Sequence, residues 1–358
     1  MNALIAVVRR HQVVSFFVLT LFLTFGISVP SLFLLGFDHP VSDVIQFCFV
    51  QLLLFSPVLA GIIISRLTDT RPRVSGQKAR WIVFLVTWVV AFVISWQTRF
   101  RYDNATVEMA AAAIRALIPA FILSLIFSGH VKLAEYLSTI LRPRGKLVWY
   151  LVALLAFPVI HVLGNVITSF MGGAARQAGN ADAAGVIFRT VVTFFSVLFF
   201  SGGLNEEAGW RGFALPRLQA RVSPLIACLV IWIFHLVWEL PGDVIFTGAP
   251  WPVVSRLVWM PSWSILFVWV YNRTGGSILA PMVFHASMNS MNTLSVLLPP
   301  TTAGTIILIA FALFAVAFDR MWKRLPSDSL AVHRVDTSSL PRRRRSDQWA
   351  QDVQDRGE

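Results

Sequence analysis

Long apolar stretches separated by short polar connections make up most of this 358-residue chain. A helix needs roughly 20 mostly apolar residues to cross the hydrocarbon core of a bilayer. About ten stretches approach that length, and we expect a helix in each: 13–36, 44–65, 81–96, 109–128, 147–170, 186–203, 223–240, 256–271, 277–297 and 302–319. The pattern predicts an all-α fold, a polytopic membrane helix bundle of about 8–10 transmembrane helices.

The stretch 186–221 has two interpretations that stay open. It is either a span followed by a loop, or one long helix that is tilted or broken. The shorter stretches elsewhere can likewise be re-entrant segments rather than full spans. The distinction decides whether the polar residues after residue 203 lie on a helix or in a loop.

The composition agrees with a membrane protein. Hydrophobic residues make up 56% of the chain and charged residues only 13%, with 29 Phe and 13 Trp. The mean hydropathy is +0.69. Few soluble domains carry so many aromatic side chains, so the composition argues against a soluble enzyme and favours contact with membrane lipids.

Basic residues are distributed unevenly between the two sets of connections. If the N-terminus is cytoplasmic, the connections on that side hold most of them: Arg66, Arg71, Arg73, Lys78, Arg80, Lys132, Arg142, Arg144, Lys146, Arg211, Arg217, Arg221 and Arg273. The opposite connections hold Arg99, Arg101 and Arg176. This positive-inside bias predicts an even number of spans with both termini in the cytosol. The net charge of +12 thus reflects orientation and anionic lipid, and no pattern resembles a nucleic-acid-binding module.

Acidic side chains are rare in the second half of the membrane region. Between residues 183 and 318 there are four, and Glu206 and Glu207 are adjacent. An ionisable residue at membrane depth is costly and is by default a functional-site hypothesis. On a helix, Glu207 and Arg211 share one face while Glu206 points elsewhere. We expect Glu207 to pair with Arg211 and Glu206 to stay free to take a proton from water. The alternative is a solvated interfacial turn with a surface salt bridge.

Two histidines lie on later apolar stretches. His235 is in an aromatic segment with Glu239 four residues further on, and its alternative interpretation is a structural histidine bonded to Glu239. His285 follows the break at Gly275-Gly276 and has Asn289 on the same helical face. An imidazole and an amide can both donate hydrogen bonds to a developing oxyanion.

An earlier pair, His161 and Asn165, has the same spacing as His285 and Asn289. The spacing alone is therefore weak evidence for a site. His285 lies in the same half of the chain as the glutamates and His235, whereas His161 lies in an earlier apolar stretch. We interpret His161 as a structural residue.

The order of these motifs resembles the CAAX prenyl protease and bacteriocin-processing family, also called CPBP or Abi. The resemblance rests on Glu-Glu-x-x-x-Arg at 206–211, a histidine in an aromatic helix that ends at Pro241, and Gly-Ser-Ile followed by His-x-x-x-Asn at 285–289. It covers roughly residues 186–297. One position departs from the pattern, because the family has an aromatic residue four before the first histidine and this chain has Ile231.

The resemblance implies an intramembrane endopeptidase with its site facing the cytosol. Its catalytic residues would be Glu206, Glu207, Arg211, His235, His285 and Asn289. Glu206 would act as general base, with His235 sharing the water, while Glu207 and Arg211 hold the helix. His285 and Asn289 would polarise the scissile carbonyl.

A metal is implied by the same resemblance. Glu206, His235 and His285 would bind a divalent ion, with zinc the leading candidate and a water in the fourth position. The sequence has no His-Glu-x-x-His helix, the usual local signature of a zinc peptidase. A glutamate-dependent hydrolase that uses the same residues without metal therefore remains an alternative.

Four regions follow from these observations. Residues 1–170 form N-terminal transmembrane helices of unassigned role, and the first of them is expected to be retained because it is longer than a signal-peptide core. Residues 186–297 form the protease core of the type described, and 298–320 the last transmembrane helix. Residues 321–358, with four consecutive arginines at 342–345, are expected to be a basic, disordered cytoplasmic tail.

The expected partners are membrane lipids and a membrane-associated, prenylated or otherwise lipidated protein or peptide substrate, with no nucleic acid. The expected location is the bacterial cytoplasmic membrane. Two other functions stay open. A catalytically idle scaffold or bacteriocin self-immunity protein would tolerate loss of Glu206, and a polytopic transporter would also place ionisable residues at membrane depth.

Overall fold

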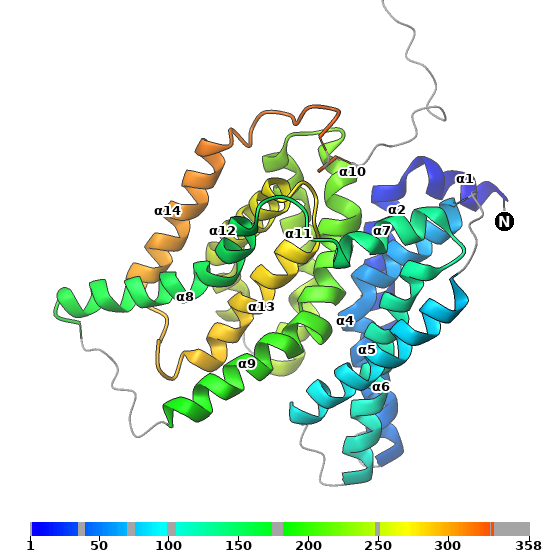
Figure 1. Ribbon diagram of the computed structural model, residues 1–358, viewed down its shortest axis with the longest axis horizontal. Helices are drawn as coiled ribbons and strands as arrows, with labels where there is room; N and C mark the ends of the chain where they lie inside the picture. Colours follow the sequence, from blue (N-terminus) through cyan, green and yellow to red (C-terminus); the bar gives the residue numbers. More distant parts are fainter. Residues whose placement is uncertain are drawn as a thin grey trace, which may run out of the picture.

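The computed structural model describes residues 2–34, 40–69, 76–98, 105–173, 182–247, 251–329 and 331–332. Throughout these residues the regular secondary structure is helical (Figure 1). The prediction of an all-α helix bundle is therefore confirmed. The expected basic tail falls largely outside the described residues, from 333 onward.

Each of the ten predicted stretches contains a helix. The helices are α2 (Gln12–Leu21) continued by the π-helical segment η1 (Phe22–Ser28) and α3 (Val29–Leu34), α4 (Pro40–Thr68), α5 (Gln77–Gln97), α6 (Ala105–Ser124) with the 3-10 turn η2 (Leu125–Phe127), α8 (Leu147–Phe170), α9 (Ala183–Phe200), α11 (Pro224–Thr247), α12 (Trp251–Arg273), α13 (Leu279–Leu294) and α14 (Thr302–Phe318). Seven helical stretches in the described chain are long and apolar enough to cross a membrane, and α14 is apolar but shorter.

Two helices of the predicted core, α12 and α13, are not among those seven. For α13 the reason is visible in its sequence. It has only 16 residues, and its polar residues include His285, Ser287, Asn289, Ser290 and Asn292. Helices that carry a polar face into the bundle interior lose the uniform hydrophobicity by which a lipid-exposed span is recognised.

Shorter helices lie outside the ten predicted stretches or in the stretch 186–221, whose interpretation was left open. They are α1 (Asn2–Arg10), α7 (Val131–Leu141), the π-helix η3 (Gly203–Ala214) and α10 (Leu215–Gln219). Figure 1 places α1, α7 and α10 at the same end of the molecule. The amphipathic α7 turns its apolar residues Leu133, Leu137 and Ile140 inward, where each is at most 2% exposed.

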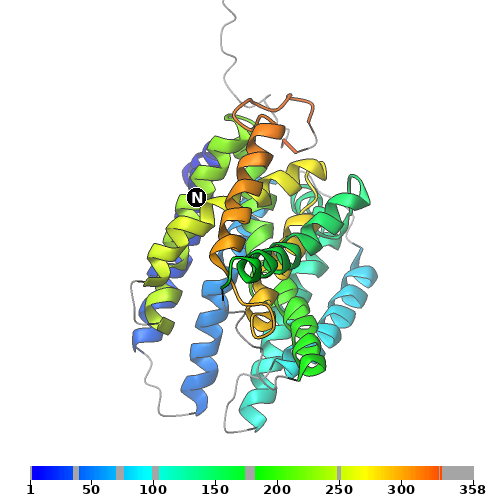
Figure 2. The ribbon, with the colours of Figure 1, turned by 90° about the vertical axis from the view of Figure 1, so that its left-hand side faces the viewer.

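The bundle has an apolar exterior and an interior centred on η3. On α5, Trp81, Ile82 and Val86 are all more than half exposed, as expected for side chains in contact with lipid tails. In contrast, Trp210 and Phe213 of η3 are completely buried. Helix α14 packs against α8 and α12 and lies along the outside of the bundle in Figure 2. The buried position of η3 matters because it carries both glutamates.

The connections that the charge pattern assigns to one side of the membrane contact one another. The backbone N–H of Lys132 donates to Asp69, and the N–H of Ile278 donates to the carbonyl of Thr139. Arg273 forms an ion pair with Asp319. These connections therefore gather at one end of the bundle, as a positive-inside arrangement requires.

Candidate active site

The two glutamates lie on a helix in the interior rather than in a solvated turn. Glu207 is 0% exposed and Glu206 is 6% exposed, so the alternative of an interfacial surface salt bridge is wrong. The chain from α9 into η3 is a broken helix, one of the two interpretations left open by the sequence. The break lies at Ser201 and Gly202, and Gly202 has a φ of +135°, a conformation that favours glycine.

After the break the chain adopts a π-helix, Gly203–Ala214. The backbone N–H of Glu207 donates to the carbonyl of Gly202 at 3.3 Å, which is the i→i+5 pattern of that helix. The side chain of Asn205 fixes the start, because its Oδ1 accepts a hydrogen bond from the N–H of Gly202 at 2.5 Å. Short π-helices are rare and are frequent at functional sites.

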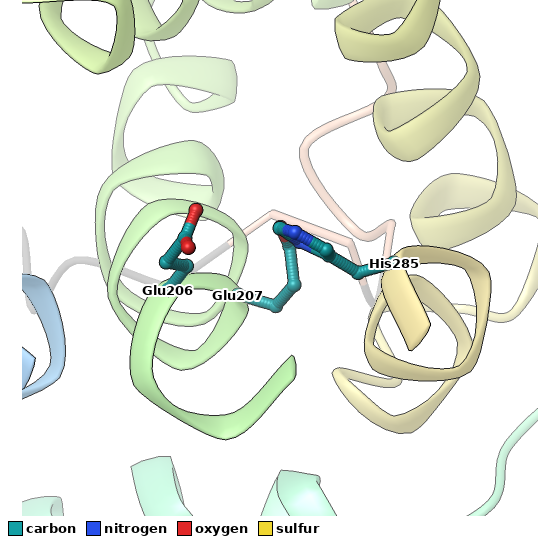
Figure 3. A group of neighbouring side chains, drawn as sticks. All are labelled: Glu206, Glu207 and His285. Carbon is teal, nitrogen blue, oxygen red and sulfur yellow. The ribbon is translucent and has the colours of Figure 1, made fainter. Parts of the chain in front are cut away.

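Glu207 is held by two partners through a single oxygen. Nη1 of Arg211 donates to Oε1 of Glu207 at 3.0 Å, which confirms the predicted pair four residues apart. Nδ1 of His285 lies 2.9 Å from the same Oε1, and Figure 3 shows the two side chains reaching toward each other from η3 and α13. Because Glu207 as a carboxylate only accepts hydrogen bonds, Nδ1 of His285 is the donor. The guanidinium of Arg211 also lies over the ring of Phe267, 4.4 Å from its centroid.

Gly202 is also the reason that His285 can approach so closely. A Cβ atom built at Gly202 would collide with the imidazole of His285. Only glycine therefore allows both the φ of +135° at the break and the packing of this ring against the backbone. The break and the histidine are one structural unit.

Glu206 lies beside Glu207 in Figure 3, on the side away from His285, and binds the other histidine. Nε2 of His235 lies 2.8 Å from Oε2 of Glu206 and 3.5 Å from Oε1 of Glu239. Glu239 in turn forms an ion pair with Arg256 of α12. The sequence predicted a free Glu206 carboxylate, but in the structure Glu206 is bonded to His235. His235 therefore contacts both Glu206 and Glu239, the partner that its structural interpretation expected.

Aromatic rings fix the orientation of His235. The ring of Trp210 stacks on the imidazole with 5.3 Å between centroids, and Trp238 lies 5.7 Å away on the same helix as His235. Packing of this kind restricts an imidazole to one rotamer and supports a fixed hydrogen-bond geometry.

A cavity of about 550 Å³ opens beside these groups, a size typical of ligand sites. Glu206, Arg211, His235 and His285 all line it, and so does Asn289, whose side chain is half-buried. Glu207 does not line it. Five of the six residues predicted from the sequence therefore face one cavity, and the sixth is bonded to two of them.

Apolar and polar walls meet in this cavity. Trp259, Met260, Trp263 and Phe267 of α12 provide the apolar side. Sequence reasoning missed the contribution of α12, including Arg256, because tryptophan and methionine in an apolar stretch look the same whether they face lipid or a binding site. It also missed Asn205, although an amide directly before two glutamates in an apolar segment was a usable signal.

The residues interpreted as structural have the expected contacts. Nδ1 of His161 lies 3.1 Å from the carbonyl oxygen of Leu298. The amide of Asn165 donates to the carbonyls of His161 and Pro299, both at 2.8 Å. These contacts tie α8 to the segment between α13 and α14 and lie outside the cavity lining.

Two groups of side chains in the described part of the chain have donor atoms that all lie within 4.8 Å of one another. They are Glu206, Glu207 and His285, and Glu206, His235 and Glu239. The trio expected from the sequence, Glu206, His235 and His285, is not one of these groups, because the two histidines bind different carboxylates.

The first group has donors that suit a divalent metal. Carboxylate and imidazole are ligands that zinc and related ions accept. Oε2 of Glu207 is buried without a hydrogen-bond partner, and a buried unpaired carboxylate oxygen requires compensation. The residues present therefore fit a metal ion.

Comparison with known proteins identifies relatives for this part of the chain. Residues 188–291 match the family described as Type II CAAX prenyl endopeptidase Rce1-like. The chain is also 23% identical over 251 residues to the CAAX prenyl protease 2 of Methanococcus maripaludis, an alignment that covers 65% of this chain and 92% of that protein. The resemblance indicated by the motifs is confirmed, and both similarities support a protease of the CAAX prenyl endopeptidase type.

Proposed function

We propose that this protein is an intramembrane endopeptidase in which Glu206 activates water for attack on a peptide bond. The observation that carries the proposal is the pairing of each glutamate with its own histidine beside one cavity. Oε2 of Glu206 lies 2.8 Å from His235 and Oε1 of Glu207 lies 2.9 Å from His285. Transport or a purely structural role does not require two buried carboxylate–histidine pairs next to a ligand-sized space.

The two oxygens of Glu206 allow the proposed division of work. Oε2 keeps its hydrogen bond to His235, while Oε1 takes a proton from water as the water oxygen attacks the scissile carbonyl. Glu206 then gives that proton to the leaving amine nitrogen when the C–N bond breaks. His235, fixed between Glu206 and Glu239, holds the carboxylate in one orientation throughout.

Asn289 is the proposed donor to the oxyanion. His285 uses Nδ1–H to bind Glu207, so in its neutral form the other ring nitrogen carries a lone pair and cannot donate. The amide of Asn289 lines the same cavity and donates without any change of charge. A metal held by Glu206, Glu207 and His285 would supply Lewis acidity to the same carbonyl.

We propose a membrane-associated peptide or protein as substrate. The tryptophan and methionine side chains that α12 contributes to the cavity suit an apolar or lipidated segment, and acidic and basic groups line the same cavity. The relative's name, CAAX prenyl protease 2, supports a prenylated substrate. The gathering of the basic connections at one end supports an orientation with that end in the cytosol.

Comparison of wild type with Glu206→Gln tests the proposal. Both proteins are purified in detergent and incubated with a prenylated peptide, and cleavage is followed by mass spectrometry. We expect Glu206→Gln to lose activity by about 100- to 10,000-fold, while Glu135→Gln, on the exposed face of α7, keeps it. Equal cleavage by wild type and Glu206→Gln would contradict the assigned base, and flux without cleavage would favour a transporter.

A further inference from the structure

The support for the glutamate-bearing helix comes from a distant part of the chain. Nδ2 of Asn205 donates to the backbone carbonyl of Leu54 in α4 at 2.9 Å, while Oδ1 of the same side chain accepts from Gly202. Asn205 is 0% exposed. One amide therefore clamps the break before η3 and attaches it to a helix about 150 residues earlier in the chain.

A proline in α4 leaves a backbone carbonyl of this part of the helix without its usual N–H donor. Pro57 lies inside the helix and has no N–H to give to the carbonyl of Leu53, four residues before it. The hydroxyl of Ser56 donates to that carbonyl instead, at 2.9 Å. In turn 53–57 of α4 the carbonyls of Leu53 and Leu54 therefore each accept a side-chain hydrogen bond within the bundle.

Contact between the two backbones is direct. A Cβ atom at Gly209 would collide with the backbone and ring of Pro57, so the helices approach as closely as glycine permits. Asn205 and Gly209 are four residues apart, about one turn of η3, and share the face toward α4. Glu207, halfway between them in sequence, points from the opposite face to His285.

The same turn of α4 also supports the histidine that binds Glu206. Nε1 of Trp238 donates to Oγ of Ser56 at 2.9 Å, and the Trp238 ring packs on His235. Ser56 also shares a 2.9 Å hydrogen bond with Thr24. One turn, residues 53–57, therefore contacts Asn205 of η3 and Trp238 of α11, the two elements that meet at the Glu206–His235 pair.

We propose that Asn205 and Ser56 are positioning residues of the active site, and that turn 53–57 of α4 sets the geometry of Glu206 against His235. The inference rests on the proposed peptidase function for its consequence in catalysis. It assigns a role to α4, which belongs to the region 1–170 left without one. Neither residue lines the cavity, so both act through Glu206 and His235 and not on substrate.

The test uses two full-length variants with matched controls. Asn205→Leu removes both hydrogen bonds of the Asn205 amide at nearly constant volume. Asn165→Leu likewise removes the two hydrogen bonds that the Asn165 amide of α8 donates to backbone carbonyls. Ser56→Ala removes a hydroxyl bonded to a carbonyl three residues earlier, and Ser124→Ala removes a buried hydroxyl of the same kind on α6. If Asn205→Leu does not fold, the Ser56 pair carries the test.

The first readout does not depend on cleavage. In protein labelled with ¹⁵N at histidine, the imidazole signal of His235 is assigned by its loss in His235→Gln. We expect this signal to move in Asn205→Leu and Ser56→Ala and to keep its wild-type position in both controls. An unchanged His235 signal in the folded variants would overturn the proposal, whatever the protein cleaves.

The second readout is steady-state cleavage. Misplacement of a catalytic group by a distant substitution can lower turnover by up to about 100-fold, so we expect kcat to fall about 10- to 100-fold in Asn205→Leu with KM unchanged. Wild-type kcat in a variant whose His235 signal has moved would also overturn the positioning role. A wild-type protein that cleaves no peptide would contradict the proposed function instead, and the histidine signal would still decide whether turn 53–57 sets the site.

Discussion

His285 and Arg211 reach the same oxygen of Glu207, at 2.9 and 3.0 Å, from two different helices. Through these two bonds to Oε1, Glu207 joins α13 to η3. Glu207 does not line the cavity, but both of its partners do. The adjacent glutamates therefore differ in kind. Glu206 faces the space where a substrate would lie, and Glu207 holds the residues around it.

Removal of Arg211 should destabilise the protein more than removal of the whole ion pair. Arg211→Met leaves the carboxylate of Glu207, which is 0% exposed, without its fixed positive charge, and breaking a buried pair in this way typically costs about 3–5 kcal/mol. Glu207→Gln combined with Arg211→Met leaves neither charge of this pair and should recover part of that loss. Detergent-denaturant titration measures the unfolding free energies, and equal losses for the single and double variants would contradict this account.

Gly202→Ala should disable the site through backbone strain and collision together. Alanine is strained at a φ of +135°, and its Cβ would displace His285. Gly172→Ala is the control, because Gly172 also has a positive φ, +75°, but a Cβ there meets nothing within 4 Å. We expect cleavage to fall about 100-fold in Gly202→Ala and to stay at the wild-type level in Gly172→Ala. Similar activity in the two variants would show that the approach of His285 to Gly202 is unimportant.

Asn289→Ala should be a kinetic lesion with little effect on folding. Its side chain is half-buried at the cavity, and removal of one oxyanion donor lowers turnover by about 100- to 1,000-fold. Asn165→Ala, which loses two structural hydrogen bonds, should show the reverse, lower stability with normal kcat. Cleavage kinetics and thermal unfolding of both variants separate the two effects, and parental activity in Asn289→Ala would rule out its assigned role.

Metal content distinguishes the two possible donor groups. If a divalent ion is bound by Glu206, Glu207 and His285, elemental analysis should find about one equivalent in wild type and its loss in His285→Ala. His235→Ala should retain the ion, since His235 belongs to the other group, and His161→Ala serves as the control. Loss of metal in His235→Ala alone would assign the ion to Glu206, His235 and Glu239. Full activity in metal-free protein would favour the glutamate-dependent mechanism without metal.

The positions of the long apolar helices were predictable because each depends on local hydrophobicity. The stretch 147–170, for example, coincides with α8. The pair Glu207 and Arg211 was predictable for a similar reason, since four-residue spacing places both side chains on one face of a helix. The π-helical form of η3 was not predictable, because the same residues satisfy an α-helical pattern.

Long-range pairing was the part that sequence could not supply. Glu206 and His235 are 29 residues apart and Glu207 and His285 are 78 apart, so either histidine could have bound either carboxylate. The predicted metal trio of Glu206, His235 and His285 reflects that ambiguity. The direction in which each glutamate leaves η3 decides the pairing, and this depends on the packing of the bundle.

The contact between Gly209 and Pro57 has a consequence for how the protein can be divided or transplanted. The segment that matches the peptidase family, 188–291, carries all the ionisable groups of the cavity but not the carbonyl of Leu54 that receives Asn205. Because the chain is made from its N-terminus, α4 is synthesised before η3, and the partner of Asn205 lies in the part that is made first. If residues 188–291 were transplanted into another helix bundle, they would carry the ionisable groups of the cavity but not the part of α4 that positions them.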